Sequence, residues 1–287
     1  MGGGCMKIAK VLNNNIAIAL DRDGNDVIVL GKGISFQKKR GDEIDASRIE
    51  RIFTQHVSEY SLRLTEMTRE IPEEYFEAVR HIVDDAKVEL GEDMDDSIYL
   101  SLTDHVHFAV QRQEEGIPLH NRLLLETKMI YRDEYRVAAR AVNYLNATFN
   151  VQLPEDEAAF IALHLVNATT SDSMGETIAV TELVQQIVTI VRNYFHVELD
   201  PDSLDYYRMM IHLKFFATRV MNRQTDAVPL GDDQLLSLVR SRYADSWACA
   251  ERIAAFVEQA RSYQVTEDEK MYLAIHIERV RHVAARS

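Results

Sequence analysis

The sequence predicts a small antiparallel β-sheet domain followed by two homologous all-α helical-bundle domains. Roughly the first 55 residues contain short β-branched runs separated by turn residues, and a helical pattern begins at about Ser58. The helical part is duplicated, because residues 154–165 and 266–277 share an acidic opening, the same apolar positions and a histidine. The 287 residues, 46% of them apolar, are sufficient for several separate cores. We therefore expect domains at 6–57, 62–168 and 174–284.

The predicted sheet consists of short strands joined by turn sequences. We expect strands near 7–12, 15–20, 26–30, 34–38 and 51–55. Asn13-Asn14 and the Asp-Arg-Asp-Gly-Asn segment at 21–25 are typical of tight turns. Residues 16–20 alternate isoleucine or leucine with alanine, which predicts a half-buried strand. A core of about 55 residues is marginal, so we expect this domain to pair with a second copy.

The helical part has clear start and stop signals. Pro72-Glu73-Glu74 and Asp200-Pro201 are expected to open helices, with proline in the first turn and carboxylates near the positive end of the helix dipole. Thr266 and Glu269 have the spacing of a capping box. The small residues at 169–175 predict a break between the two copies.

The duplicated unit is roughly 110 residues long and contains two histidines in each copy. His164 in the first copy corresponds to His276 in the second. Upstream, a further set is matched at spacings of three and seven residues: His105, Phe108 and Arg112 with His212, Phe215 and Arg219. A shared core explains matched apolar residues, but it does not require histidine twice per copy. The histidines therefore indicate a function.

Three roles are open to these four histidines. Each alone is most simply a core residue. Metal ligation is a second role, but the sequence has no HExxH motif and no His-x3-His pair, and the only close partner is His107. The third is phosphoryl acceptance, since a neutral imidazole is a good nucleophile and Arg112 and Arg219 could pair with the added charge. Asp104 could orient His105, whereas Ile211 precedes His212.

Charge distinguishes the predicted sheet domain from the rest of the chain. The net charge is −14, yet residues 1–53 hold nine basic and seven acidic residues, a balance of +2 that leaves −16 on the remainder. No run of about 20 apolar residues is present, so no membrane insertion is expected. The two cysteines, Cys5 and Cys249, fit a reducing cytoplasm and exclude a cysteine-based zinc site.

The sheet domain contains two polar segments suited to nucleic acid. They are Asn13-Asn14-Asn15 and the Gly-Lys-Gly-Ile-Ser-Phe-Gln-Lys-Lys run at 31–39. Amides read base edges, glycines let the backbone approach a sugar-phosphate chain, and an aromatic ring stacks on unpaired bases. The simpler alternatives are that Asn13-Asn14 is only a turn, that Lys38-Lys39-Arg40 is only a solvated face, and that Phe36 belongs to the core.

Several motifs together resemble the BglG/LicT/SacY family of transcriptional antiterminators. They are the opening at 6–15, the run at 31–39, Ser-Leu-Thr-Asp-His at 101–105 and the two histidine-bearing helices. The resemblance extends from Met6 to the C-terminus. It implies an RNA-binding co-antiterminator domain that dimerises, followed by two helical phosphotransferase-system regulation domains. By position it assigns the RNA surface to Lys10, Asn15, Gly31, Lys32, Gly33 and Phe36, and the phosphorylation sites to His105, His164, His212 and His276.

The resemblance also implies a mechanism with two inputs. Phosphorylation of the first regulation domain through a sugar-specific permease (enzyme II) keeps the protein inactive, and phosphorylation of the second by the phosphocarrier HPr favours the active dimer. That dimer binds a hairpin in nascent mRNA and prevents a terminator from forming. Lys32 replaces an arginine found in several family members, which retains the charge but not the planar guanidinium.

Two other function classes compete with this interpretation. A DNA-binding activator with the same regulation domains would need a helical reading head, whereas the N-terminus reads as strands. A histidine metal enzyme would need ligand spacing and an acid–base pair that the sequence lacks. We expect a cytoplasmic regulator, not an enzyme, with no cofactor, no metal and no DNA partner.

Overall fold

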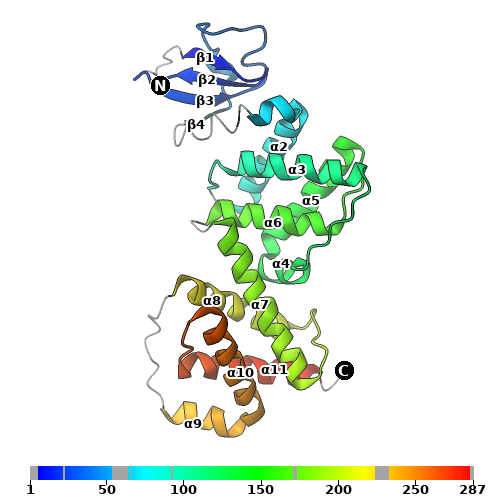
Figure 1. Cartoon of the computed structure of the whole chain (residues 1–287), viewed down its shortest axis with the longest axis vertical. Helices are drawn as coiled ribbons and strands as arrows, with labels where there is room; N and C mark the ends of the chain where they lie inside the picture. The colour runs from blue at the N-terminus through cyan, green and yellow to red at the C-terminus, as the bar shows by residue number, and fades with distance from the viewer. Residues whose placement is uncertain are drawn as a thin grey trace. The chain divides into compact units, whose positions relative to one another are not determined.

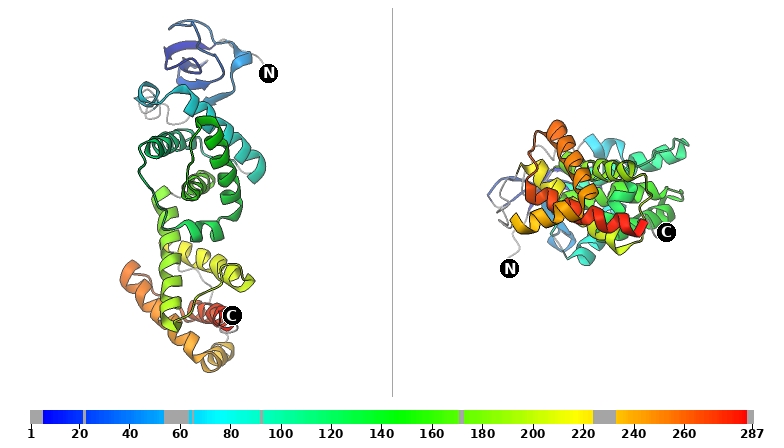
Figure 2. Two further views of the ribbon diagram at one scale, coloured as in Figure 1. Left: turned by 90° about the vertical axis from the view of Figure 1, so that its right-hand side faces the viewer. Right: turned by 90° about the horizontal axis from the view of Figure 1, so that it is seen from below.

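The computed structural model describes residues 6–21, 23–53, 64, 66–91, 93–170, 173–223 and 233–284. The chain divides into two compact units (Figure 1). The first comprises residues 1–118 and 141–153, and the second comprises residues 119–140 and 154–287. Two further views show the strands and helices from other sides (Figure 2). The prediction of an N-terminal antiparallel sheet followed by helical domains is confirmed.

The sheet has four antiparallel strands in the order β1-β2-β3-β4. The strands are β1 Lys7–Val11, β2 Ile16–Leu20, β3 Asp26–Leu30 and β4 Arg51–Phe53. Asp21 closes the β2–β3 turn by accepting from the backbone N–H groups of Asp23 and Asn25, at 2.9 and 2.8 Å. The predicted strand at 51–55 is confirmed over Arg51–Phe53, and its last two residues lie outside the described part of the chain.

The middle strand β2 is more buried than its sequence predicts. Ala17 and Ala19 belong to a core with Ile8, Val27, Val29, Ile34 and Ile44. Ile16 and Ile18, on the opposite face, are also buried, and only Leu20 at the end of the strand is exposed. The expectation of a half-buried strand is therefore wrong for most of β2, because this strand is central in the sheet and both of its faces are covered.

The expected strand at 34–38 is absent, because the backbone there folds into successive tight turns. Ile34 N–H donates to the Gly31 carbonyl at 3.0 Å, and Lys38 N–H donates to the Ser35 carbonyl at 3.0 Å. Gln37 has a φ of 57°, which a strand does not accommodate. The segment therefore satisfies its polar backbone groups locally and extends the loop after β3.

Two helices of the first unit follow the sheet. They are α2 Glu73–Leu90 and α3 Ile98–Glu114, which pack against each other. Pro72 is the N-cap of α2, Glu73 and Glu74 lie in its first turn, and Gly91 ends it in the left-handed conformation at φ 66°. The predicted helix opening at Pro72 is confirmed. Another helix, α5 Arg132–Phe149, begins in the second unit and ends in the first.

The second unit contains the remaining described helices. They are α4 Leu124–Ile130, α6 Glu155–Thr169, α7 Met174–Phe195, α8 Leu204–Asn222, α9 Asp233–Arg242, α10 Ala244–Arg261 and α11 Glu267–Ala284. Its core includes Ile187, Met209, Leu213, Trp247 and Ala274, which are fully or almost fully buried. The apolar faces of α7, α8, α10 and α11 thus form one core, and α8 and α11 are brought into contact.

The starts of α11 and α8 are set by side-chain hydrogen bonds to the backbone. Thr266 and Glu269 form the predicted capping box, with the Thr266 hydroxyl accepting from the Glu269 N–H at 3.2 Å. The helix opening expected at Asp200-Pro201 is wrong by a few residues. Asp200 forms a turn by accepting from the Asp202 N–H at 3.0 Å, and Ser203 is the N-cap of α8 instead.

Candidate functional site

The polar surface of the sheet domain is built from two loops that are hydrogen-bonded together. Asn13 accepts from the Asn15 N–H at 2.9 Å, which fixes the β1–β2 turn. The Asn14 carbonyl accepts from the Ser35 N–H at 3.0 Å, and the Asn15 carbonyl accepts from the Gly31 N–H at 2.9 Å. The two segments selected from the sequence therefore form one continuous surface.

The glycines in this surface are required by the backbone. A Cβ on Gly31 would lie 1.8 Å from the carbonyl oxygen of Arg48, so only glycine allows these two chain segments to approach. Gly33 has a φ of 62°, and its N–H donates to the side-chain oxygen of Asn15. Gly31 is itself buried, which gives it a packing role in shaping the loop that presents Lys32.

The side chains expected to contact RNA are mostly on the surface. Lys32 and Lys10 are exposed, and Lys10 lies on the edge strand β1. Phe36 is 56% exposed, whereas its neighbours Ile34 and Ser35 are buried. The alternative that Phe36 belongs to the core is therefore wrong. An exposed phenylalanine beside hydrogen-bonding amides and a lysine is suited to base stacking.

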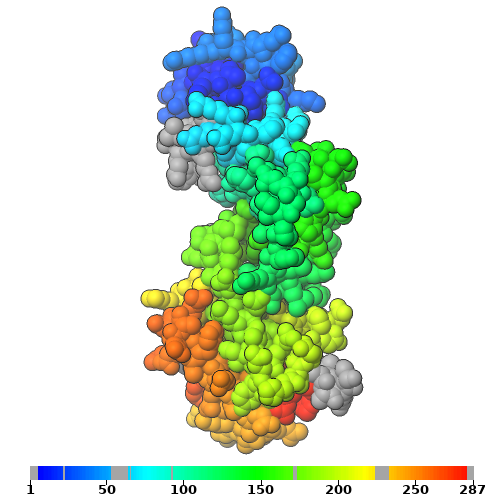
Figure 3. Space-filling model, turned by 45° about the vertical axis from the view of Figure 1, so that its right-hand side comes forward, coloured from blue at the N-terminus to red at the C-terminus, as the bar shows by residue number. Residues whose placement is uncertain are grey.

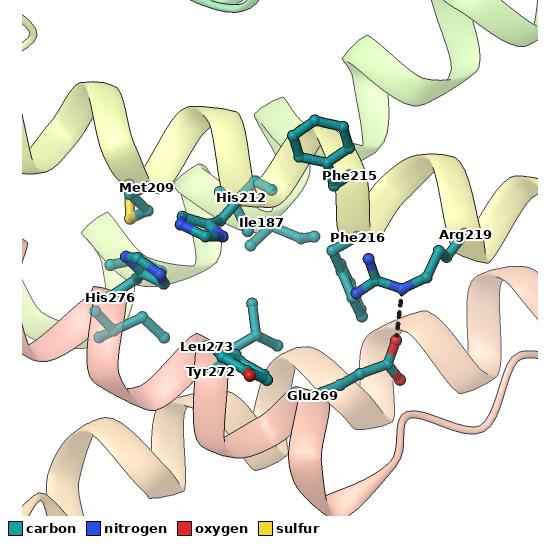
Figure 4. A pocket seen from close by; sticks show the side chains of 13 residues that line it. Ile187, Met209, His212, Phe215, Phe216, Arg219, Glu269, Tyr272, Leu273 and His276 are labelled. Carbon is teal, nitrogen blue, oxygen red and sulfur yellow. Dashed lines mark hydrogen bonds and ion pairs between the residues drawn. The ribbon is translucent and has the colours of Figure 1, made fainter. Parts of the chain in front are cut away.

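A second site lies in the second unit, where two of the predicted histidines face each other (Figure 4). His212 on α8 and His276 on α11 have ring centroids 4.0 Å apart and ring planes inclined by 30°. His212 is exposed and His276 is partly buried. The sequence places these residues 64 positions apart, so only the packing of α8 against α11 brings them together.

The surroundings of His276 keep its imidazole neutral. Burial lowers its pKa from 6.5 to about 4, and the positive charges of His212, Arg279 and Arg208 add to the effect against the opposing influence of Asp205. At physiological pH the ring is therefore unprotonated. A neutral imidazole can act as a nucleophile, and nearby arginines would stabilise an anionic group attached to it.

The histidine pair borders a pocket of about 280 Å³. Most of its lining is apolar, and its polar groups are the two histidines, Arg219 and Glu269. The full lining is Ile187, Val191, Met209, His212, Leu213, Phe215, Phe216, Arg219, Glu269, Tyr272, Leu273, His276 and Ile277. The pocket combines a rim that carries two histidines with an apolar wall.

Arg219 is already engaged at the far side of this pocket (Figure 4). Its Nε lies 3.3 Å from Oε1 of Glu269, whose side chain is almost completely buried. Glu269 also accepts from the Tyr263 hydroxyl at 3.1 Å and from the Thr266 N–H at 3.1 Å. Burial and the Glu269 carboxylate raise the pKa of Tyr263 to about 12. A phosphoryl group on the histidine pair would therefore have to use the remaining N–H groups of Arg219 or displace Glu269.

The first repeat places its histidines at equivalent positions. His105 lies on α3 and His164 on α6, and both are partly buried. His164 and His276 lie the same number of residues after the starts of α6 and α11. His105 belongs to the first compact unit and His164 to the second. Matched phenylalanines are exposed in both repeats, at 49% for Phe108 and 58% for Phe215.

His107, the close neighbour of His105, occupies an aromatic environment in the first unit. Its ring meets Tyr75 edge-on at 5.1 Å between centroids, and it lies 5.6 Å from Phe108. Its Nδ1 is buried without a hydrogen-bond partner among the residues that the structure describes. These contacts are those of a packing residue that joins α3 to α2.

Within the described ranges, no group of three or more histidine, cysteine, aspartate or glutamate side chains is arranged to hold a metal ion. Within the same ranges, none of the helices combines the length and apolar character needed to cross a membrane.

The stability of the fold should depend on the protonation of His276. Because its pKa is lowered on folding, the unfolded chain binds a proton between about pH 6.5 and pH 4 while the folded chain does not, so stability falls as the pH falls through this window. The free energy of unfolding should fall less between pH 7 and pH 5 in His276→Gln than in wild type, as measured by urea titration at each pH. His120→Gln, at an exposed loop position, is the control. An unchanged pH dependence in His276→Gln would contradict the assignment.

Family models match the parts of the chain that contain these two sites. The family model of the CAT RNA binding domain matches residues 6–61, and that of the PRD domain matches residues 80–168 and 185–280. The chain is 42% identical over 275 residues to transcription antiterminator LicT of Bacillus subtilis, covering 96% of this chain and 99% of that protein. It is 40% identical over 276 residues to the beta-glucoside operon antiterminator of Dickeya chrysanthemi, covering 96% and 97%.

A solved structure shows the same arrangement for part of the chain. The crystal structure of GlcT CAT-PRDI covers 58% of this chain and all of that one, with a TM-score of 0.54 and 30% identity. The comparisons confirm an RNA-binding sheet domain followed by regulatory helical domains, and they do not support a DNA-binding activator. The chain belongs to the BglG family of transcriptional antiterminators, RNA-binding proteins that are regulated through the sugar phosphotransferase system.

Proposed function

We propose that this antiterminator binds its RNA hairpin as a homodimer through the loop surface of the sheet domain. The residues proposed to form this surface are Lys10, Asn15, Gly31, Lys32, Gly33 and Phe36. The domains proposed are the co-antiterminator domain at 6–57 and the regulation domains at 62–168 and 174–284. The chain acts in the cytoplasm, where nascent mRNA is made, and it is a regulator and not an enzyme. The exposed ring of Phe36 between amides and a lysine supports this surface.

The phosphoryl acceptors proposed are His105 and His164 in the first regulation domain and His212 and His276 in the second. The observation that supports this assignment most strongly is the pair of rings 4.0 Å apart at the rim of a pocket. Two histidines in a shared core would be expected to bury both rings, whereas His212 is exposed to an incoming donor. Arg208 and Arg279 lie close enough to His276 to affect its titration.

The chemistry proposed at the His212–His276 pair is transfer of a phosphoryl group from a histidine of the donor protein to one of these two imidazoles. The phosphorus–nitrogen bond to the histidine of the donor breaks as a bond to the acceptor nitrogen forms. The acceptor ring releases the proton of its other nitrogen, and the donor ring takes up a proton. The low pKa of His276 keeps a lone pair available for this step. The dianionic product then lies among arginines, where charge-assisted hydrogen bonds stabilise it.

Two donors are proposed to act on the two regulation domains. HPr phosphorylates the second domain and favours the active dimer, and the sugar-specific permease leads to phosphorylation of the first and inactivates the protein. A charge of nearly two units added at a helix surface changes which surfaces can pack together. The acceptors are placed on α3, α6, α8 and α11, the helices that build the domains, which supports a direct effect on domain packing.

The RNA surface is tested by removing the ring of Phe36. Phe36→Ala should weaken binding of an RNA hairpin with unpaired loop bases by about 1–3 kcal/mol, because base stacking on an aromatic ring is lost. Phe108→Ala, which removes a similarly exposed ring from a helix, is the matched control. Affinity is measured by fluorescence anisotropy on the full chain. If Phe36→Ala folds and binds as tightly as Phe108→Ala, the stacking assignment fails.

A further inference from the structure

The amides of the proposed RNA surface are occupied by carboxylates from the same chain. The Asn15 Nδ2 donates to Oε1 of Glu77 at 3.0 Å, and the Asn14 Nδ2 donates to Oε2 of Glu73 at 3.3 Å. Both glutamates belong to the start of α2, in the same compact unit as the sheet. One of the two amide hydrogens of each asparagine is therefore used within the protein rather than offered to a base edge.

These contacts are part of a larger acidic edge. Glu73 and Glu77 are four residues apart and so lie on one face of α2, with Glu74 beside them. A cleft of about 420 Å³ lies where this edge meets the RNA surface. It is lined on one side by Glu73, Glu74 and Glu77, and on the other by Asn14, Asn15, Lys32, Gly33 and Phe36. Every sheet-domain residue of this lining belongs to the two loops of the proposed RNA surface.

Further polar contacts join the sheet domain to α2 and to the segment that precedes α3. The Lys32 N–H lies 3.4 Å from a carboxylate oxygen of Glu50, and the other oxygen of Glu50 pairs with Arg80 of α2 at 3.1 Å. Arg51 of β4 pairs with Asp96 at 2.6 Å. In the space-filling view, α2 lies directly against the sheet domain (Figure 3). Because partly exposed ion pairs of this kind contribute little net stability, the contact is of a kind that a competing ligand can displace.

The chemistry of this edge resembles that of the expected ligand. A carboxylate accepts hydrogen bonds from amides as phosphate and base-carbonyl oxygens do, and it presents negative charge to the same lysine. Three carboxylates next to Lys32 and Phe36 would also repel a phosphate backbone at short range. RNA and the start of α2 therefore cannot both occupy Asn14 and Asn15 in this geometry.

We infer that the RNA surface has two competing occupants, the RNA hairpin and the acidic start of α2, so that α2 inhibits RNA binding in the conformation described. This inference rests on the proposed RNA surface. It makes Glu73, Glu74 and Glu77 an intramolecular competitor whose displacement is part of RNA binding. Tyr75, between Glu74 and Phe76, contacts His107 on α3 and stacks on Phe149 at 4.3 Å, so the inhibitory edge is anchored to the helix that bears His105.

The test compares two triple variants of the full chain. Glu73→Gln with Glu74→Gln and Glu77→Gln removes the negative charge from the inhibitory edge and leaves the shape of each side chain. The control changes Glu114, Glu182 and Glu258 to glutamine, which removes the same charge from exposed positions elsewhere. The probe is a synthetic RNA hairpin with unpaired loop bases, selected for binding to the wild-type chain. Melting curves verify that both variants are folded.

The edge variant should bind the probe at least about fivefold more tightly than wild type at low salt, and the control should bind like wild type. The gain should shrink at high salt, because screening weakens both the intramolecular contacts and the repulsion of RNA. Equal affinities of the edge variant and the control would overturn the inference.

Adding Phe36→Ala to each chain separates the two hypotheses, the RNA surface and the competition for it. If it weakens binding everywhere while the glutamines have no effect, the RNA surface is correct and only the competition is wrong. If it has no effect in any background, both are wrong.

Discussion

Replacing both His212 and His276 with alanine is expected to abolish phosphorylation of the second regulation domain by HPr. The two rings face each other at 4.0 Å, so either could accept the phosphoryl group when the other is absent, and the double variant is needed. Wild-type protein incubated with phosphoenolpyruvate, the general phosphotransferase proteins and no permease should acquire acid-labile, alkali-stable label within residues 174–284. The double variant should acquire none in that region, as measured by mass spectrometry of its peptides.

The control for this loss is a pair of histidines outside the site. His120→Ala with His282→Ala also removes two imidazoles, from an exposed loop and from an exposed position near the end of α11, and it should be labelled as wild type is. The variant lacking all four predicted acceptors should not be labelled by either donor. Label that persists in that quadruple variant would place the modification elsewhere, with His107 the first candidate.

Gly31→Ala should have the largest effect on the fold of the sheet domain. The added Cβ would lie 1.8 Å from the carbonyl oxygen and 2.9 Å from the carbonyl carbon of Arg48, and 3.3 Å from the Glu50 nitrogen. All three atoms are backbone, so no side chain can rotate away. The Arg48–Glu50 segment must move, which strains the hydrogen bond from the Glu50 N–H to the Leu30 carbonyl and the pairing of β4. We expect a loss of about 3 kcal/mol.

The measurement for Gly31→Ala must report on the sheet alone, because the helical units can remain folded. Hydrogen exchange of peptides that cover β2 and β3 meets this need. Gly24→Ala is the control: its φ of 82° imposes backbone strain, but nothing lies within 4 Å of the added Cβ, so a cost of about 1 kcal/mol is expected. If exchange in Gly31→Ala is no faster than in Gly24→Ala, the close approach to Arg48 does not matter for stability.

The elements that could be predicted from the sequence are those fixed by local interactions. A turn closed by Asn13 joins β1 to β2, and a turn closed by Asp21 joins β2 to β3. The capping box of Thr266 and Glu269 begins α11. Each depends on hydrogen bonds between residues only a few positions apart. The matched histidines were also predictable, because duplication shows the same position twice in the sequence.

The errors concern residues whose state depends on distant parts of the chain. Residues 34–38 have the composition of a strand, but they form tight turns, and the Ser35 N–H donates to the Asn14 carbonyl of the β1–β2 turn. Phe36 is apolar enough for a core, yet the turns leave it 56% exposed. The opposite face of β2 is buried although its sequence pattern predicts one solvated face.

The site itself was only partly predictable for the same reason. Histidines 64 positions apart give no sign of facing each other, and Arg219 appears in the sequence as an available cation. In the fold it is paired with the buried Glu269, which belongs to the capping box of another helix. The glutamates of α2 appear in the sequence only as a favourable helix start, and their contact with Asn14 and Asn15 is a tertiary property.

We propose that charge placed on His212 and His276, the paired histidines of the second regulation domain, controls RNA binding by the sheet domain. This claim is tested most directly by the affinity of the full chain for its RNA hairpin before and after phosphorylation by HPr. We predict that phosphorylation tightens binding in wild type and has no effect in the His212→Ala, His276→Ala double variant. The same affinity before and after phosphorylation of wild type, or the same tightening in the double variant, would contradict the claim.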